Sequence, residues 1–403
     1  MKETVKKKII IVNNNMKVGG VQKSLCNLLW SVYDEYDVTL CLFSKRGSYM
    51  NEIPSGVKVI ESRGPFRYFG ISQAECKKHF SDKVKRGALA LLCKIFGRSK
   101  ILKLMLKFEG VIQDEFDCAV AFLHNGRKKS FYGGVQEYVL KCVKANRKIA
   151  FLHCDYEKCG ANNENNNCTI EQFDLVAACS EGCKSTFVSA VPRLKEKCTT
   201  VRNFHRYEEI HKLADNDTIN YDVNTINLVI VSRLSHEKGI DRAINVCAEE
   251  YRKGHNITLH ILGEGPMRGE LEELAARLRI SDRVIFHGEQ SNPYRYMKNA
   301  DILLMTSYHE AAPMVIDEAI SLGLPVLTMQ TTSSDEMVKD TQGGWVCENN
   351  SESFAITLDK LLNDLNAVEL ISNNLKKRMN ERNNNDALAA FRYAVTGENL
   401  QVD

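Results

Sequence analysis

The sequence predicts an α/β protein made of two doubly wound domains, each built on a parallel β-sheet, and three observations lead to this prediction. The chain has 403 residues, more than the ~250 to 300 residues that a single hydrophobic core usually serves. Nearly continuous runs of Val, Ile and Leu recur along it, as in strands that are buried on both faces of a parallel sheet. Helical patterns separate these runs, and such β-α alternation is typical of doubly wound sheets.

The strand candidates form two groups along the chain. The first group is KKIIIV, VTLCLF, DCAVAFL, KIAFLHC and DLVAACS, and the second is NLVIVSRL, ITLHILG, VIFHG, DILLMTS and LPVLTM. Helical patterns such as GGVQKSLCNLLWSVY and MRGELEELAARLRI lie between them. The polar stretch KLADNDTINYDVNTI has no sustained apolar period and is expected to join the domains.

The expected organisation follows from this break. An N-terminal domain covers residues 1–212, a linker covers 213–226, and a C-terminal domain covers 227–385. A C-terminal helix and tail at 386–403 can cross back to the first domain. Two such domains joined by a linker leave a cleft, and ligands of open parallel sheets bind at the carboxyl ends of the strands.

Composition and the N-terminus indicate a cytoplasmic globular protein. The chain is 44% hydrophobic and 26% charged, close to the globular average, which excludes global disorder. The apolar part of MKETVKKKIIIVNNN is only Ile9 to Val12, shorter than the ~7 to 15 residues of a signal-peptide core. No run reaches the ~18 apolar residues that indicate a membrane-spanning helix.

The fourteen cysteines are expected to be reduced, because most lie in apolar strand-like runs, where a free thiol behaves as a small buried hydrophobe. One cluster, His153, Cys154, Cys159 and Cys168 around ANNENNNC, offers four metal ligands. It has no C-x-x-C pair and no second ligand pair at zinc spacing. We therefore expect no metal and no cofactor, with structural zinc at this cluster as the alternative.

Two motifs follow strands at positions where an anion can bind. Gly19 and Gly20 come after KKIIIV and let the backbone approach an anion at the start of the next helix, although a simple tight turn is the alternative. Arg233 and Lys238 follow NLVIVS. An arginine forks onto phosphate oxygens and a lysine adds a point charge, so this strand end can hold a diphosphate. Its alternative is a solvated helix start.

The stretch HEAAPMVIDEA combines a helix start with two carboxylates. Pro313 suits the first helical position, which leaves the amides of Met314 and Val315 as a phosphate seat at the positive end of the helix. Glu318 lies one turn into this helix on the same face, and Glu310 lies at the exit of the preceding strand. Because carboxylates accept hydrogen bonds from hydroxyls, the pattern favours a nucleoside diphosphate sugar over two exposed capping acids.

On these motifs the sequence resembles the retaining glycosyltransferases of family four, which have the GT-B fold of two Rossmann-like domains facing across a cleft. The resemblance is carried by GGVQKSL, FLHCDY, VSRLSHEKGI, ILGEGPMRGELEELAARL, VIFHGEQSNPYRYMKNADILLMTSYHEAAPMVIDEAISLGLPVL and GGWVC. It spans nearly the whole chain and is strongest from about 225 to 350. KIAFLHCDY followed by FDLVAACSEGCKSTFV is similar to bacterial enzymes that build capsular and other surface polysaccharides.

The resemblance implies a role for each candidate residue. The catalytic candidates are those expected at the reacting sugar and the departing diphosphate: Glu310, His153, Arg233 and Lys238. The donor-binding candidates are those expected at the nucleotide, the phosphates and the ribose: Gly19, Gly20, Arg233, Lys238, Gly288, Met314, Val315 and Glu318.

The resemblance also implies the reaction. A retaining hexosyltransferase would move a sugar from a nucleoside diphosphate sugar, with a UDP-sugar favoured, to a growing, lipid-linked surface polysaccharide. No second carboxylate stands out as a nucleophile, which favours front-side displacement with the leaving diphosphate stabilised by Arg233 and Lys238. These cations replace a metal, and the D-x-D from Asp215 to Asp217 is expected to be solvated linker. The alternatives are a GT-B epimerase or phosphorylase, or a non-catalytic sugar-nucleotide-binding partner of another transferase.

The expected partners are the donor, a glycan or lipid-linked glycan acceptor and an anionic membrane surface, with no nucleic acid. The membrane is expected to contact the segment from Lys77 to Phe108 at the inner face of the cell membrane. Apolar blocks interrupt its basic residues and can lie in a bilayer interface, although two ordinary amphipathic helices are the alternative. The residues expected at the membrane are the basic ones of this segment: Lys77, Lys78, Lys83, Lys85, Arg86, Lys94, Arg98, Lys100, Lys103 and Lys107.

Overall fold

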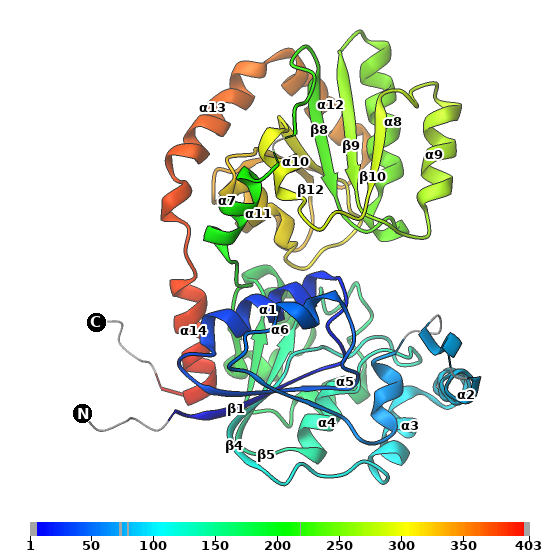
Figure 1. The fold of residues 1–403 in the computed structure, drawn as a ribbon, viewed down its shortest axis with the longest axis vertical. Helices are drawn as coiled ribbons and strands as arrows, with labels where there is room; N and C mark the ends of the chain where they lie inside the picture. The colour runs from blue at the N-terminus through cyan, green and yellow to red at the C-terminus, as the bar shows by residue number, and fades with distance from the viewer. Residues whose placement is uncertain (1–5, 72–74, 79, 218, 399–403) are drawn as a thin grey trace. The chain divides into compact units, whose positions relative to one another are not determined.

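The computed structural model describes residues 6–71, 75–78, 80–217 and 219–398, which form two compact units (Figure 1). Unit 1 contains the chain up to Phe204 and again from Asn384 onward, and unit 2 contains His205–Asn383. Each unit has one sheet in which every described strand pair is parallel. The prediction of two doubly wound parallel sheets is confirmed.

The sheet of unit 1 has seven strands in the order β3-β2-β1-β4-β5-β6-β7. Its strands are β1 (Lys8–Asn13), β2 (Asp37–Leu42), β3 (Lys58–Glu61), β4 (Glu115–Ala121), β5 (Lys144–Leu152), β6 (Leu175–Ala178) and β7 (Cys198–Thr200). Its helices are α1 (Gly20–Val32), α2 (Phe80–Phe96), α3 (Arg98–Leu106), α4 (Val135–Cys142), α5 (Glu164–Ile170), α6 (Glu181–Ala190) and α14 (Asn385–Thr396). The strand order reverses direction between β1 and β4, which is where doubly wound sheets bind ligands.

The sheet of unit 2 has six strands in the order β10-β9-β8-β11-β12-β13. Its strands are β8 (Ile226–Val231), β9 (Ile257–Leu262), β10 (Val284–Gly288), β11 (Ile302–Met305), β12 (Val326–Met329) and β13 (Gly344–Cys347). Its helices are α7 (Tyr207–Asp215), α8 (Ile240–Arg252), α9 (Arg268–Arg277), α10 (Tyr294–Asn299), α11 (Met314–Ser321), α12 (Ser351–Asn363) and α13 (Leu365–Lys377). Here the order reverses between β8 and β11.

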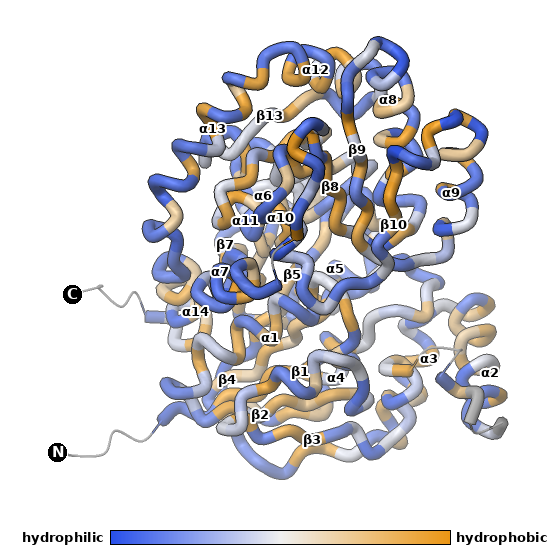
Figure 2. The backbone as a smooth tube through the Cα atoms, turned by 45° about the horizontal axis from the view of Figure 1, so that its top comes forward, coloured by the Kyte–Doolittle hydropathy of each residue, from blue (hydrophilic) through white to orange (hydrophobic). Residues whose placement is uncertain are grey.

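The central strands are mainly apolar where helices cover them, and Figure 2 shows many strands of both sheets as largely hydrophobic stretches. Ile9 and Ile11 of β1 are fully buried in one core cluster with Leu25 and Leu29 of α1. Phe391 of α14 belongs to the same cluster. The last described helix therefore packs into unit 1.

The segment predicted as a linker is partly helical. The units divide between Phe204 and His205, before the expected boundary at 212, and α7 occupies the stretch YEEIHKLAD. Ile210 and Ala214 are buried in a core cluster of unit 2, and acidic residues in the first turn suit the positive end of a helix. Two buried positions one turn apart anchor this short helix, so the linker prediction is corrected there.

Candidate functional site

The loops that follow β8 and β11 meet at the point where the strand order of unit 2 reverses. The Thr306 hydroxyl donates to the carbonyl oxygen of Lys238 at 3.3 Å, and the Tyr308 amide donates to the carbonyl oxygen of Glu237 at 3.0 Å. Gly239 has φ of +58°, and a Cβ there would overlap the Thr306 carbonyl oxygen. Glycine is therefore required where the two loops approach each other.

Lys238 and Glu310 form an ion pair across these two loops. The Lys238 Nζ donates to Glu310 Oε1 at 2.5 Å, and the Ser307 hydroxyl donates to the same oxygen at 2.8 Å. The two side chains are 23% and 14% exposed. The sequence predicted each residue on its own motif, and the structure brings them together at one strand-end site.

Arg233 lies on the same loop but is more exposed. Its side chain is 68% exposed, pairs with the Glu237 carboxylate and donates from Nε to the Ser235 hydroxyl at 3.3 Å. Burial acts to raise the pKa of Glu237, but hydrogen bonds from Ser235 and its own backbone, with the nearby Arg233, lower it to about 2. Arg233 therefore lies at the rim of the site, paired with the Glu237 carboxylate, which stays ionised.

The helix that begins after HEAAP is α11. Pro313 has an extended backbone with ψ of 117° and is the residue before the helix, so α11 starts at Met314. The prediction placed Pro313 inside the first turn, one residue too far. The amides of Met314 and Val315 are at the open positive end of this helix, since the first amides of a helix have no intrahelical partner.

Glu318 is buried on α11, with 7% of its surface exposed. The Tyr294 hydroxyl of α10 donates to its Oε1 at 3.2 Å. The alternative of an exposed capping acid is therefore wrong for Glu318. The sequence analysis did not identify Tyr294 as a site residue. The only sequence feature that includes it is the motif NPYRYMKN.

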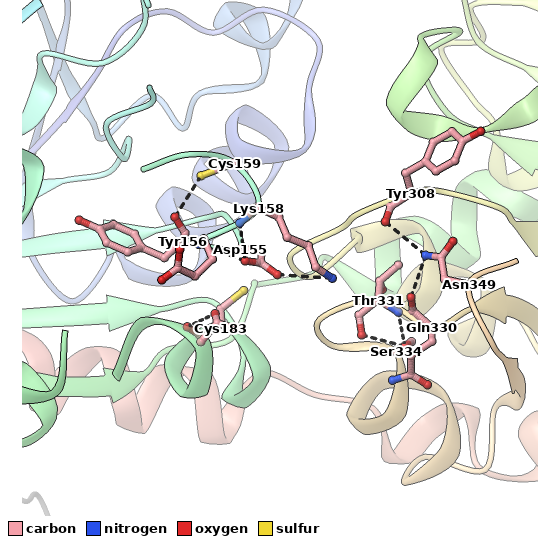
Figure 3. A network of polar contacts seen from close by, with 12 residues as sticks. Asp155, Tyr156, Lys158, Cys159, Cys183, Tyr308, Gln330, Thr331, Ser334 and Asn349 are labelled. Carbon is pink, nitrogen blue, oxygen red and sulfur yellow. Dashed lines mark hydrogen bonds and ion pairs between the residues drawn. The ribbon is translucent and has the colours of Figure 1, made fainter. Parts of the chain in front are cut away.

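Asn349, which follows β13, holds the site loops in place and was also missed. Its Nδ2 donates to the carbonyl oxygens of Ser307, Tyr308 and Gln330 at 3.1, 3.2 and 2.9 Å, and Figure 3 shows the contacts with Tyr308 and Gln330. Arg242 of α8 donates to the Asn349 side-chain oxygen at 2.8 Å. These bonds fix the backbone that carries Glu310.

Gly288 lies where the exits of β8, β9 and β10 crowd together. It ends β10 with φ of +71°, and its carbonyl oxygen accepts the Gly263 amide at 2.8 Å. A Cβ on Gly263 or Gly265 would overlap the carbonyl oxygens of Ser232 and Leu234 respectively. The ILGEG motif is therefore glycine-rich because its backbone packs against the loop that carries Arg233.

In unit 1, the glycine pair begins α1 as predicted. Gly19 is the residue before the helix and has an extended backbone, and Gly20 is the first helical residue. Apart from its chain neighbours and the backbone of α1, no atom of the described chain would lie within 4 Å of a Cβ on Gly20. The space beside Gly20 is open, as an approaching ligand would need.

His153 also lies in unit 1, directly after β5. Its partly buried ring packs against Phe122 and Phe151, with centroids 4.6 and 5.6 Å away. Burial, assisted by His124, lowers the pKa of His153 to about 3. The lowered pKa leaves the ring neutral, and its Nε2 is buried without a hydrogen-bond partner in the described chain.

The basic segment forms α2 and α3, and most of its lysines reach solvent. Lys83, Lys85, Lys94, Lys100, Lys103 and Lys107 are exposed and Arg86 is partly buried. The side chains of Lys77 and Lys78 lie outside the described part of the structure. In that part, no helix is both long and apolar enough to cross a bilayer.

Arg98 was wrongly predicted to contact a membrane. It is only 2% exposed, and its Nη1 donates to the carbonyl oxygens of Gly126 and Tyr132 at 3.1 and 2.8 Å. Its Nη2 donates to Asn166 Oδ1 at 2.5 Å. Two of these acceptors lie in the loop between β4 and α4 and the third lies in α5, so Arg98 is a structural arginine inside unit 1.

The same segment exposes large apolar side chains on α2 and α3 and, just beyond α3, at Phe108. Six of them are more than half exposed, a high value for their types: Val84 (52%), Leu91 (57%), Ile95 (55%), Phe96 (54%), Leu104 (51%) and Phe108 (72%). The alternative, in which leucines pack inward and only lysines face solvent, does not account for these positions. The surface of α2 and α3 is therefore both basic and apolar.

Two groups of acidic residues in unit 2 bring carboxylates together. Asp215 and Asp217 of the D-x-D are 64% and 88% exposed and face Lys298 and Arg295, as expected of solvated acids. Glu250, His255 and Asp359 come close together, but Lys253 already donates to both carboxylates, at 2.9 and 2.7 Å. A lysine therefore supplies the positive charge at that cluster.

Comparison with known proteins gives a family match for unit 2 and whole-chain matches in fold. Residues 215–383 match the family described as glycosyl transferases group 1. An uncharacterized glycosyltransferase of Methanocaldococcus jannaschii is 32% identical over 165 residues, 40% of this chain and 42% of the relative. The capsular polysaccharide biosynthesis glycosyltransferase CapM of Staphylococcus aureus is 26% identical over 178 residues, 43% of this chain and 44% of the relative.

The structural matches cover nearly the whole chain. The crystal structure of Anabaena HepE in complex with UDP and glucose has a TM-score of 0.68 and 18% identity, covering 97% of this chain and 100% of that one. The lipopolysaccharide glycosyltransferase WaaG has a TM-score of 0.64 and 17% identity, with the same coverage. The curated relatives named above are matched over only 42% and 44% of their own length. Residues 215–383 thus match the family model for glycosyl transferases group 1, and the whole chain has the GT-B fold.

Proposed function

We propose that this chain is a retaining glycosyltransferase that takes a sugar from a nucleoside diphosphate sugar, preferably a UDP-sugar. The observation that carries the proposal is the Lys238–Glu310 pair at the exits of β8 and β11. Glu310 lies on the loop that leads into α11, which carries the buried Glu318. A cation and helix amides can bind phosphates, and carboxylates can accept hydrogen bonds from sugar hydroxyls. The UDP and glucose named for HepE support the choice of donor.

The donor diphosphate is proposed to lie at the start of α11. The amides of Met314 and Val315 would donate to it, and Lys238 would turn from Glu310 toward the phosphate, which is the stronger anion. Arg233 would add its guanidinium from the rim. These fixed donors would stabilise the negative charge that develops as the diphosphate departs.

The two glutamates would then serve opposite ends of the donor. Glu318, held by Tyr294, would accept hydrogen bonds from the ribose hydroxyls. Glu310, released by Lys238 but still held by Ser307, would bind the transferred sugar. His153, a neutral imidazole, would face the reacting sugar from unit 1.

The proposed chemical step is a front-side displacement. The acceptor oxygen forms its bond to the anomeric carbon on the face from which the bond to the phosphate oxygen breaks, and that phosphate oxygen takes the acceptor proton. The configuration at the anomeric carbon is kept. Because Lys238 and Arg233 supply positive charge at the diphosphate, added Mg²⁺ or Mn²⁺ is not expected to raise turnover.

A donor-binding screen followed by product analysis tests this proposal. A nucleotide sugar at 100 times its Kd should stabilise the protein by ~2.7 kcal/mol, a rise in Tm of about 5 to 11 °C. With that donor and a glycan acceptor, NMR should show a product with the donor's anomeric configuration. Donor binding without hydrolysis or transfer would favour a non-catalytic binding partner, and an inverted product would reject the mechanism.

We further propose that α2 and α3 dock on the anionic inner face of the cell membrane, where a lipid-linked glycan acceptor would be found. Exposed lysines alternate there with exposed apolar side chains, the combination that binds an anionic interface. Each lysine near such a surface contributes up to ~1 kcal/mol. The names of relatives in capsule and lipopolysaccharide core biosynthesis support a surface polysaccharide as the acceptor.

Liposome flotation tests the membrane proposal. The chain should float with vesicles that contain anionic lipid at low salt, and less at high salt, since charge attraction is screened. Lys103→Glu with Lys107→Glu should abolish flotation, and the matched pair Lys376→Glu with Lys377→Glu on α13 should not. Equal recovery in the unbound fraction under all conditions would leave α2 and α3 as ordinary surface helices.

A further inference from the structure

The neighbouring strands β4 and β5 carry a histidine and a cysteine at their carboxyl ends. The strands are parallel, with Ala121 of β4 opposite Ala150 of β5, so the residues that follow them emerge at the same edge of the sheet. His124 follows β4 and Cys154 follows β5. The turn that follows places a second thiol, that of Cys159, near Cys154, because the Cys159 amide donates to the carbonyl oxygen of Asp155 at 3.0 Å.

The Asp155 side chain fixes the shape of this turn. Its Oδ1 accepts the amides of Glu157 and Lys158 at 3.1 and 3.0 Å. Its carboxylate also faces the Lys158 ammonium, and the Cys159 sulfur lies 3.9 Å from the carbonyl oxygen of Tyr156 (Figure 3). Cys159 is therefore held in position before any ligand arrives.

The three side chains converge. One ligand atom from each of His124, Cys154 and Cys159 lies within 4.8 Å of the other two. His124 and Cys154 are each 7% exposed, and Cys159 is partly buried. A buried polar atom is normally hydrogen-bonded, yet His124 Nδ1 has no hydrogen-bond partner within the described residues.

We propose that His124, Cys154 and Cys159 bind a zinc ion, with His124 Nδ1, the two sulfurs and a water molecule as the four ligands. Thiolate and imidazole are the ligands that zinc prefers, and four residues between two cysteine ligands is within the spacing of known zinc sites. Zinc would give the orphaned His124 nitrogen its partner. The inference is independent of the proposed transferase activity.

The ionisation of these groups suits a metal. Burial, with Arg98 nearby, lowers the pKa of His124 to about 4, so its imidazole is neutral at physiological pH, the form that binds metal. A hydrogen bond from Cys154 lowers the pKa of Cys159, which makes Cys159 the first of the two thiols to ionise. The second proton would leave when the metal binds.

This site differs from the zinc alternative drawn from the sequence, which grouped His153 and Cys168 with the two cysteines. Cys168 is exposed, and His153 packs its ring on Phe122 and Phe151. His124 lies thirty residues before Cys154 in the sequence. The pairing of β4 with β5 brings the two residues close together. The zinc would tie the turn from Asp155 to Gly160 to the edge of the sheet, next to His153.

The test measures zinc in the full-length chain, purified under reducing conditions from zinc-supplemented cells. Elemental analysis should find stoichiometric zinc, and cobalt exchanged into the site should show sulfur-to-cobalt charge-transfer absorption. Cys154→Ser and Cys159→Ser should each weaken zinc binding by more than the ~10- to 100-fold that loss of an outer-shell partner causes. Cys168→Ser, which removes an exposed thiol from the same segment, should bind zinc normally.

A second measurement uses the unchanged sequence, so it does not depend on whether a variant folds. Alkylation mapped by mass spectrometry should show that zinc slows modification of Cys159 but not of Cys168. Two results would overturn the proposal. One is no stoichiometric zinc together with Cys159 labelling that zinc does not change, and the other is a purified Cys154–Cys159 disulfide that binds no zinc after reduction.

Discussion

Breaking the Lys238–Glu310 pair should destabilise unit 2 measurably, and a double-mutant cycle can isolate the pair from its surroundings. The groups are 2.5 Å apart and mostly buried, at 23% and 14% exposure. Two unit charges about 4 Å apart attract by ~4 kcal/mol at the effective dielectric of a protein surface. Desolvation offsets part of this, so the net coupling should be about 1.5 to 3 kcal/mol, as for other hydrogen bonds to charged groups.

The chain offers a direct optical assay for this cycle. It has two tryptophans, with Trp30 in α1 of unit 1 and Trp345 in β13 of unit 2. In a Trp30→Phe background, urea unfolding followed by fluorescence reports on unit 2 alone. The cycle uses Lys238→Met, Glu310→Gln and their combination.

A surface pair in the same unit gives the matched control. Arg268 and Glu272 on α9 are 2.9 Å apart but 35% and 47% exposed, so their coupling should be only ~0.3 to 0.5 kcal/mol. The reasoning is refuted if the Lys238–Glu310 coupling is no larger than that of the control pair.

Three further predictions follow from the site and its loops. Glu318→Ala should weaken donor binding about ten- to a hundredfold by calorimetry, whereas Glu310→Ala should lower turnover more than affinity; unchanged values in both would reject their roles. Gly239→Ala should lower the stability of unit 2 by ~1 to 3 kcal/mol because of its left-handed backbone and the overlap, while Gly269→Ala, with open space in α9, should be neutral or raise it by ~0.4 to 1 kcal/mol. Glu237, with its pKa depressed from 4.5 to about 2, stabilises unit 2 fully above pH 4.5 and loses this effect as the pH falls toward 2; Glu237→Gln should flatten that acid limb in urea titrations, and an unchanged pH profile would contradict the assignment.

The central strands could be predicted because burial on both faces gives each of them an apolar run of at least four residues. The outer strands β3, β7 and β13 were not predicted. Both ends of β3 are exposed, β7 has three residues, and most of β13 is only partly buried. Strands at or near a sheet edge need no long apolar run, so their pattern is too weak to recognise.

The site residues could also be predicted only where the local sequence pattern identifies them. Glu310 and Lys238 could be proposed because each stands next to a strand whose end is visible in the sequence. Asn349 and Tyr294 could not, because their role rests on contacts with segments far away in the chain. Arg98 was misplaced for the same reason, since the carbonyl groups around it come from loops that the local pattern does not contain.

The packing of α14 has a consequence for how the protein acquires its structure during synthesis. Phe391, Ala394 and Val395 fill the core of unit 1, and Arg147 donates to the carbonyl oxygen of Ala394 at 2.7 Å. Unit 2 is thus an uninterrupted stretch of chain inserted between two parts of unit 1. On the ribosome, unit 2 can fold as soon as it emerges, whereas the nascent unit 1 must wait with part of its core uncovered until α14 arrives.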